Sequence, residues 1–290
     1  MTVPAVLPDF LPAQVQLRLQ GAQRVQTVLN DVRTVWHVWG DATHPCVVLL
    51  HGGSGSWLHW VRNVAALLEA GWRVLVPDLP GFGDSDLPLG CIDADALPVH
   101  LHAGLAQLHP VGRVQLVGFS FGGMTAGLWL QAYPQDAQAL VLVGAPGMGL
   151  QTAVRMPLKG WRHLPTPEAQ ADIHRHNLMA LMFHEASALD DLALALHTAN
   201  VHRDRMPRRR LSSTDILARA LPDLQVPVSA IYGEHDALYR ERLPEVQGAM
   251  QMLCRQWNRW TTLPGAGHWV QYEAAQAFNA ALIETLSDQD

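Results

Sequence analysis

The sequence is poor in cysteine, in lysine and in long apolar runs. Its 290 residues include three cysteines, Cys46, Cys91 and Cys254. An odd number of widely spaced cysteines favours reduced, buried thiols over a disulfide framework or a cysteine-based zinc site. No stretch approaches the roughly 18 consecutive apolar residues of a membrane-spanning helix, so no membrane span is expected. Lys159 is the only lysine among 20 basic residues, and we give this bias no functional meaning.

Positive charge is also scarce, since 20 basic residues face 26 acidic ones and the net charge is −6. Nucleic-acid binding needs a basic surface that displaces counterions from phosphates, so we expect a small-molecule partner and no nucleic acid. The stretch Met1–Gln20 carries three prolines and an aspartate where a secretory leader has a basic start and an apolar core. We therefore expect a cytoplasmic protein.

Short, nearly continuous apolar runs recur along the chain and predict strands that are buried on both faces of a parallel sheet. The runs are Cys46–Leu50, Val74–Val76, Val114–Val117, Leu140–Val143 and Val228–Tyr232. Between them lie helix-length amphipathic segments, namely Val61–Ala70, Leu97–Leu108 and Phe121–Tyr133. Ahead of them, alternating segments at Val15–Gln20 and Thr34–Trp39 predict an antiparallel hairpin. This order predicts an open, mostly parallel, doubly wound α/β sheet.

The alternation of strand and helix is interrupted between Val143 and Val228. Helical stretches there, roughly Thr166–Phe183, Ala188–Ala199 and Ser213–Ala220, are punctuated by prolines and predict a helical lid. We expect residues 146–223 to form this cap, inserted after the sixth strand, and residues 1–145 and 224–290 to form the core. The core then ends with a helix at Leu243–Leu253, a strand at Trp257–Leu263 and a helix at Tyr272–Leu286.

The stretch Gly118-Phe119-Ser120-Phe121-Gly122 follows a predicted strand and opens a predicted helix. This is the context that a G-x-S-x-G nucleophile elbow requires. So tight a turn forces the serine into strained backbone geometry, and glycines two residues away make room for it. The pattern therefore predicts Ser120 as a nucleophile, which needs a base within hydrogen-bond reach and a third group that orients the base.

Two residues downstream of Ser120 fit these roles, because each follows a predicted strand. Asp236 ends the stretch 233–236, and His268 ends the glycine-containing stretch 264–268. The carboxyl ends of parallel strands meet at one edge of the sheet, so the three side chains can converge. Glu234 is the nearest alternative to Asp236. Further carboxylates on loops that can reach the same edge are Asp86, Asp93 and Asp95.

The stretch His51-Gly52-Gly53-Ser54-Gly55, which we name the oxyanion loop, follows the strand that ends at Leu50. With this loop, the order Ser120, Asp236, His268 resembles the α/β-hydrolase family over nearly the whole chain. The resemblance implies an eight-stranded sheet with an inserted lid. It also implies an oxyanion hole formed by the backbone amides of Gly53 and Phe121, with Ser54 as the alternative to Gly53. A mechanism of this kind requires no cofactor.

Several residues near these loops are candidates for substrate binding. Trp57, Trp60 and Trp269 either wall an apolar pocket or pack in the core. Phe119, which directly precedes Ser120, is a further candidate for apolar contact with the substrate. Arg203 and Arg205 belong to an arginine-rich run that either binds a substrate carboxylate or forms a solvated turn. The lid also holds six histidines, but their spacing presents no third ligand, so no metal site is predicted.

The segment 268–273, His-Trp-Val-Gln-Tyr-Glu, resembles the carbon–carbon bond hydrolases that cleave aromatic ring-fission (meta-cleavage) products. Those enzymes commonly carry asparagine before the nucleophile, where this chain has Phe119. Phenylalanine on both sides of Ser120 favours a small, largely apolar carboxylic ester that is cleaved through an acyl-enzyme. A carbon–carbon bond hydrolase is the second hypothesis, and a non-catalytic small-ligand receptor on the same fold is the third hypothesis. Serine at 120 excludes the dehalogenases and epoxide hydrolases of this fold, which use aspartate there.

Overall fold

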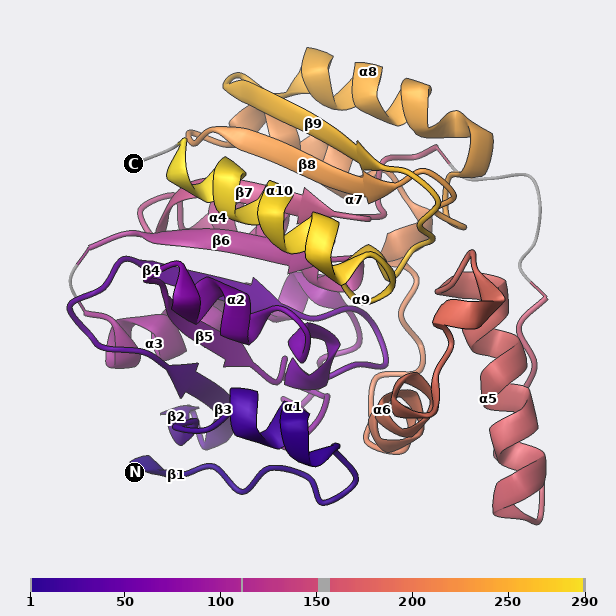
Figure 1. Cartoon of the computed structure of the whole chain (residues 1–290). Coiled ribbons are helices and arrows are strands. Elements are labelled where there is room, and N and C mark those ends of the chain that lie inside the picture. Colours follow the sequence, from indigo (N-terminus) through magenta and orange to yellow (C-terminus); the bar gives the residue numbers. More distant parts are fainter. Residues whose placement is uncertain (1, 111, 151–156, 289–290) are drawn as a thin grey trace.

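A single sheet organises the part of the chain that the computed structural model describes, residues 2–110, 112–150 and 157–288 (Figure 1). Its strands are β1 (Thr2–Pro4), β2 (Gln23–Leu29), β3 (Val32–Trp39), β4 (Cys46–Leu50), β5 (Arg73–Pro77), β6 (Val114–Phe119), β7 (Ala137–Val143), β8 (Val228–Gly233) and β9 (Trp257–Leu263). The order across the sheet is β1-β2-β3-β5-β4-β6-β7-β8-β9. The six strands from β5 to β9 in this order run parallel, and β1, β2 and β3 are antiparallel additions at one edge.

Helices cover both faces of this sheet, as the predicted doubly wound arrangement requires. One face carries α2 (Val64–Glu69), α9 (Val270–Glu273) and α10 (Ala275–Ser287), and the other carries α3 (Pro98–Leu108), α4 (Phe121–Ala132) and α8 (Leu243–Leu253). Every residue of β4, β6 and β8 is buried, because a sheet covered on both faces leaves no wet side. The predicted last helix is two helices, α9 and α10, which meet at Ala274.

The predicted strand at Val15–Gln20 is wrong, since this stretch forms the short helix α1 (Ala13–Arg18). Apolar residues do alternate there, but α1 buries none of its residues and only Leu19, just after it, is fully covered. The hairpin instead joins β2 to β3 through Asn30 and Asp31, whose φ angles of 51° and 63° are those of a two-residue hairpin turn. Strand β2 thus replaces the predicted first strand, and β1 adds a ninth to the eight expected.

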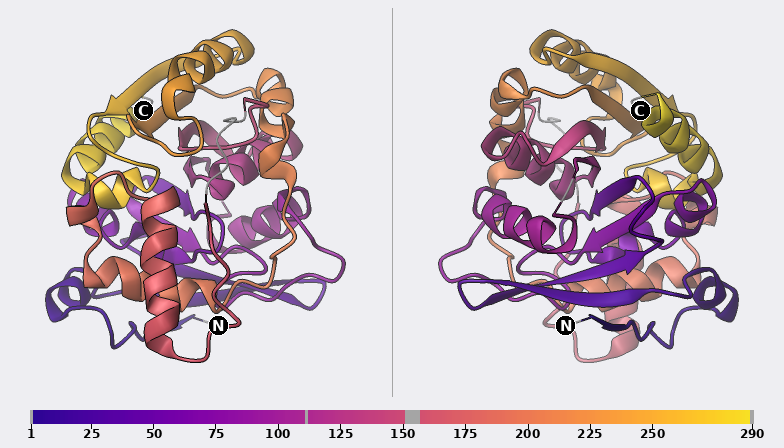
Figure 2. Two further views of the ribbon diagram at one scale, coloured as in Figure 1. Left: turned by 90° about the vertical axis from the view of Figure 1, so that its right-hand side faces the viewer. Right: turned by 90° about the vertical axis from the view of Figure 1, so that its left-hand side faces the viewer.

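The segment between β7 and β8 contains α5 (Pro167–Leu181), α6 (Asp191–Val201) and α7 (Ile216–Ala220). Helices α5 and α6 each begin after a residue whose side chain caps the helix. The side chain of Thr166 accepts a hydrogen bond from the amide of Ala169, and that of Asp190 accepts one from the amide of Ala193. Helices α5 and α6 pack together beside the carboxyl ends of the parallel strands (Figures 1 and 2). Helix α7 packs against α4 in the core layer. We propose that residues 146–223, of which 151–156 lie outside the described residues, act as the cap, with α5 and α6 as the part next to the sheet edge.

Two glycines allow β6 and α4 to meet at the elbow and to lie against β4. A Cβ atom on Gly118 would lie 2.5 Å from the carbonyl oxygen of Gly122. A Cβ on Gly122 would lie 2.5 Å and 2.6 Å from the carbonyl oxygens of His51 and Leu50. Real Cβ atoms do not approach backbone oxygens so closely, so both positions are restricted to glycine.

We therefore expect Gly122→Ala to lower the thermal unfolding temperature and to displace the elbow. In contrast, Gly248 lies at an exposed position of helix α8 with open space around it, so Gly248→Ala should stabilise the protein by about 0.5–1 kcal/mol because alanine favours the helix. Calorimetry of the two variants beside the wild type measures both effects. Equal, small shifts for both variants would contradict the close packing of β4 against α4.

Candidate active site

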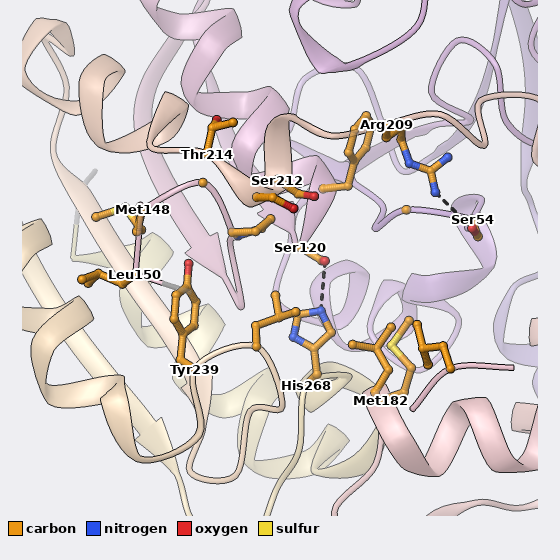
Figure 3. Close-up of a pocket in the computed structure, with 18 of the residues that line it drawn as sticks. Ser54, Ser120, Met148, Leu150, Met182, Arg209, Ser212, Thr214, Tyr239 and His268 are labelled. Carbon is orange, nitrogen blue, oxygen red and sulfur yellow. Dashed lines mark hydrogen bonds between the residues drawn. The ribbon is translucent and has the colours of Figure 1, made fainter. Parts of the chain in front are cut away.

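Ser120 lies in the turn between β6 and α4 with φ 51° and ψ −120°, a conformation that non-glycine residues rarely adopt. Its amide donates to the carbonyl of Val143 at 2.7 Å, which fixes the turn to the neighbouring strand β7. The strained turn directs the side chain away from the sheet and towards His268 (Figure 3).

A continuous chain of hydrogen bonds joins Ser120, His268 and Asp236. Nε2 of His268 lies 2.9 Å from Oγ of Ser120, and Nδ1 lies 2.9 Å from Oδ2 of Asp236. His268 and Asp236 are buried, with 1% and 0% of their surfaces exposed. The other carboxylate oxygen of Asp236 accepts from the amide of Leu238 at 2.9 Å, which fixes the carboxylate in its turn.

The structure does not bring the alternative carboxylates into this chain. Glu234 accepts from the amide of Gly265 at the protein surface. Asp86 pairs with Arg33, Asp93 accepts from the amides of Arg210 and Leu211, and Asp95 lines a second hollow beside α3 and α4. After β7, where the family sometimes places its acid, Gly144 passes so near Asp236 and His268 that a Cβ there would lie 3.0 Å from an atom of each.

The oxyanion loop approaches Ser120 from β4. Neither the amide of Gly53 nor that of Phe121 has a hydrogen-bond partner among the described residues, so both are free to donate to a ligand. Two buried imidazoles support this loop from the core side. His51 donates from Nδ1 to the carbonyl of Gly52 at 2.8 Å and accepts at Nε2 from Leu79, and His59 accepts at Nδ1 from the amide of Gly52 at 3.2 Å.

Only neutral imidazoles can accept these hydrogen bonds. Burial lowers the pKa of His51 to about 4 and, with the neighbouring His51, lowers the pKa of His59 well below its usual range. Both rings are therefore uncharged at neutral pH, and each has a fixed tautomer. The glycine-rich loop is thus held by two side chains that act as hydrogen-bonding groups without charge.

A cavity of about 560 Å³ opens beside Ser120 and His268. Its apolar lining includes Met148, Leu150, Leu181, Met182 and Leu238, and its polar lining includes Ser54, Arg209, Ser212, Ser213 and Thr214. Figure 3 shows Ser120 near the middle of the cavity, with Met148, Leu150 and Tyr239 on one side and Arg209 with Ser54 on the other. The hydroxyl of Tyr239 donates to the carbonyl of Ala145 at 2.7 Å, and burial raises its pKa.

The aromatic side chains predicted to contact substrate, Trp57, Trp60, Phe119 and Trp269, are buried and do not line this cavity. Phe119 and Trp269 are the chain neighbours of Ser120 and His268. The ring of Phe119 packs 5.0 Å from that of His268, and the ring of Trp269 packs 5.0 Å from that of His59. Trp57 lies farther away and stacks on His37 at 4.7 Å. Of the two interpretations given for the tryptophans, their positions favour packing in the core.

The two arginines expected to bind substrate are also engaged elsewhere. Arg203 forms an ion pair with Asp84 at 3.0 Å, and the guanidinium of Arg205 donates to the carbonyls of Phe82, Gly83 and Ser85. Arg209, from the same run, lines the cavity instead. Sequence reasoning missed it because five arginines within eight positions look alike. No local signal separates Arg209 from the other four, and in the structure the carboxylate of Asp204 holds it in place.

No group of three or more His, Cys, Asp or Glu side chains is arranged to hold a metal ion in residues 2–110, 112–150 and 157–288. In the same ranges, no helix is both long enough and apolar enough to cross a lipid bilayer.

Comparisons with known proteins agree with the observed fold. A family model described as the alpha/beta hydrolase family matches residues 47–281. The chain is 27% identical over 261 residues to a 2-hydroxy-6-oxo-6-phenylhexa-2,4-dienoate hydrolase of Burkholderia cepacia, which covers 83% of this chain and 87% of that protein. It is 30% identical over 257 residues to a 2-hydroxy-6-oxononadienedioate/2-hydroxy-6-oxononatrienedioate hydrolase of Cupriavidus pinatubonensis (strain JMP 134 / LMG 1197), with 83% and 86% covered.

Among solved structures, the esterase RhEst1 from Rhodococcus sp. ECU1013 has a similar fold, with a TM-score of 0.75. The likeness covers 93% of this chain and 100% of that one at 22% sequence identity. At this level of identity the comparison concerns the fold alone.

The buried imidazoles predict how stability depends on pH. The unfolded chain protonates His51 near pH 6.5, whereas the folded protein resists this until about pH 4, so the free energy of unfolding should fall as the pH drops through this window. His51 alone contributes a loss of about 3 kcal/mol, and His59 acts in the same direction. Urea unfolding at stepped pH should show a smaller loss for His51→Gln, while the exposed His44→Gln control keeps the wild-type profile. Identical profiles for His51→Gln and the wild type would refute this.

Proposed function

The chain belongs to the alpha/beta hydrolase family, and on this basis we propose that it is a serine hydrolase with Ser120 as nucleophile, His268 as general base and Asp236 as the orienting acid. The observation that carries the proposal is the buried hydrogen-bond chain through both nitrogens of His268, which ends at Ser120 on the wall of a cavity. A nucleophile, a base and a group that orients the base are the three parts that such catalysis needs.

In this mechanism Oγ of Ser120 attacks the substrate carbonyl carbon while Nε2 of His268 takes the hydroxyl proton. The buried carboxylate of Asp236 stabilises the imidazolium through Nδ1–H. The negative oxygen of the tetrahedral intermediate accepts from the amides of Gly53 and Phe121. His268 then gives the proton to the leaving alcohol, and water, activated by the same imidazole, releases the acid from the acyl-enzyme.

The cavity lining favours a small, uncharged ester. Arg209 is the only Asp, Glu, Lys or Arg among the described residues that line the cavity, and the carboxylate of Asp204 already neutralises it at 2.9 Å and 3.0 Å. An anionic substrate would have to compete with that carboxylate for the guanidinium. The methionines and leucines of the lining offer an apolar surface to the acyl or the alcohol group.

A carbon–carbon bond hydrolase is the second candidate. The relatives from Burkholderia cepacia and Cupriavidus pinatubonensis support it by their names, since both are hydrolases of 2-hydroxy-6-oxo acids. In such a reaction His268 would also help to convert the dienol to its keto form before attack, and Arg209 would have to bind the substrate carboxylate. The two candidates use the same nucleophile and differ in whether the substrate carries a charge.

One assay separates the candidates. We expect the wild type to hydrolyse p-nitrophenyl acetate and butyrate with a higher kcat/KM than a 2-hydroxy-6-oxo-dienoate, and Ser120→Ala to lose both activities by at least about 10³-fold. A higher kcat/KM for the dienoate would select the carbon–carbon bond hydrolase. Turnover of neither substrate would leave a non-catalytic ligand receptor, and ester turnover that survives Ser120→Ala would reject the nucleophile.

A second pair of variants tests the acid. Asp236→Asn should lower kcat for the preferred substrate by about 10⁴-fold, because the amide no longer stabilises the imidazolium or selects its productive tautomer. Glu234→Gln, two residues away in the same loop, should stay within about twofold of the wild type because the Glu234 carboxylate contacts Gly265 and His235 at the surface, away from Ser120 and His268. Steady-state kinetics of both variants decide the matter. A larger loss in Glu234→Gln than in Asp236→Asn would exchange the two assignments.

A further inference from the structure

The oxyanion loop contains a strained residue that is bonded to the cap. Ser54 has φ 50°, in the left-handed region that residues other than glycine adopt only at a cost of about 1 kcal/mol or more. Its hydroxyl donates to Oδ2 of Asp204 at 2.6 Å and accepts from Nη2 of Arg209 at 3.1 Å. Both partners lie about 150 residues later in the chain, in the cap, so the cap holds this conformation in place.

Asp204 and Arg209 are themselves a closed unit. Nη1 of Arg209 donates to both carboxylate oxygens of Asp204, and Oδ1 of Asp204 also accepts from the amide of Met206 at 2.8 Å. Only 7% of the Asp204 side chain and 16% of the Arg209 side chain are exposed. Charge-assisted hydrogen bonds shielded from water are stronger than surface ion pairs, so the unit can impose its geometry on Ser54.

The same guanidinium touches both segments that carry the proposed oxyanion donors. A Cβ atom on Gly53 would lie 3.2 Å from Nη2 of Arg209 and 3.6 Å from Cβ of Phe121, so Arg209 packs directly against the loop backbone. The guanidinium also lies over the rings of Phe82 and Phe121, at 4.9 Å and 5.4 Å from their centroids. Figure 3 shows Arg209 extending to Ser54 beside the nucleophile.

The loop has few other constraints on this side. Three of its five residues are glycines, which restrict the backbone least. From the core, His51 and His59 hold Gly52, one residue before the donor. Beyond the loop, the hydroxyl of Ser56 donates to Asn200 of helix α6 at 2.6 Å, a second bond to the cap. The Ser54–Asp204–Arg209 cluster is thus the contact that fixes the backbone immediately after Gly53.

We propose that Asp204 and Arg209 are positioning residues that set the Gly53 amide for the oxyanion, an inference that rests on the proposed serine-hydrolase function. The cap is then required for the chemical step as well as for enclosing the substrate. Loss of the cluster frees Ser54 to leave its strained conformation, and the Gly53 amide turns away from the site of charge development.

Asp204→Asn tests this with the smallest change in shape. We expect kcat to fall by about 10-fold to 100-fold and KM to stay within about threefold of the wild type. The upper limit is the loss that follows complete removal of one oxyanion donor, about 100-fold. Ser54→Ala should give a similar loss, and the double variant should lose no more than the larger single loss, because both changes break one unit. Asp84→Asn is the matched control, since it breaks the cap-to-core ion pair with Arg203 without touching the oxyanion loop.

A trifluoromethyl ketone distinguishes positioning from general damage, because it forms a tetrahedral adduct with the serine and presents an oxyanion. Its inhibition constant should rise in the Asp204→Asn and Ser54→Ala variants in proportion to their loss of kcat/KM, and stay unchanged in Asp84→Asn. An unchanged inhibition constant in folded Asp204→Asn and Ser54→Ala, or an equal rise in Asp84→Asn, would overturn the positioning role. A wild type that forms no adduct at all would overturn the proposed function itself.

Discussion

The imidazole of His268 is hydrogen-bonded at both nitrogens, and most of the sheet edge is arranged around that geometry. A distance of 2.9 Å on each side leaves little freedom for the ring, so the residues that bear its partners must be fixed independently. Ser120 is fixed by a turn in which the backbone is strained, and Asp236 by its bond to the amide of Leu238. Gly144 passes so close to Asp236 and His268 that position 144 has no room for a side chain.

Two different kinds of support act on the oxyanion loop. From the core, the neutral rings of His51 and His59 bond to the glycine backbone, and burial keeps them neutral. From the cap, Asp204 and Arg209 form a charged but internally neutralised pair. In our account, the core provides the nucleophile and base, whereas the oxyanion geometry depends on core and cap together. The same pairing neutralises Arg209, the only cationic side chain among the described residues that line the cavity. An anionic substrate would therefore have to compete with Asp204, which links the position of the loop to the choice of substrate.

The predicted α/β-hydrolase fold is confirmed by the family match and the sheet topology. It could be predicted because strongly apolar runs specify strands that are covered on both faces. The convergence of Ser120, His268 and Asp236 also follows from the sequence, since each follows a strand of one parallel sheet. The predictions that were wrong, the first strand and the choice of arginine, concern features that depend on packing between distant segments. The alternation at Val15–Gln20 is equally compatible with a surface helix, and nothing local separates Arg209 from its four arginine neighbours. Side-chain direction in the cap is set by contacts with loops more than a hundred residues away.

Covalent labelling of the nucleophile tests the central claim most directly. A fluorophosphonate transfers its phosphonyl group to a serine that is activated by a base, with loss of fluoride, and leaves ordinary serines unmodified. Peptide mass spectrometry of the treated protein should show one stoichiometric adduct, on Ser120, and the adduct should be absent when His268 is replaced by alanine. An unmodified Ser120, or an equal adduct on Ser212 or Ser213 of the same cavity, would contradict the account.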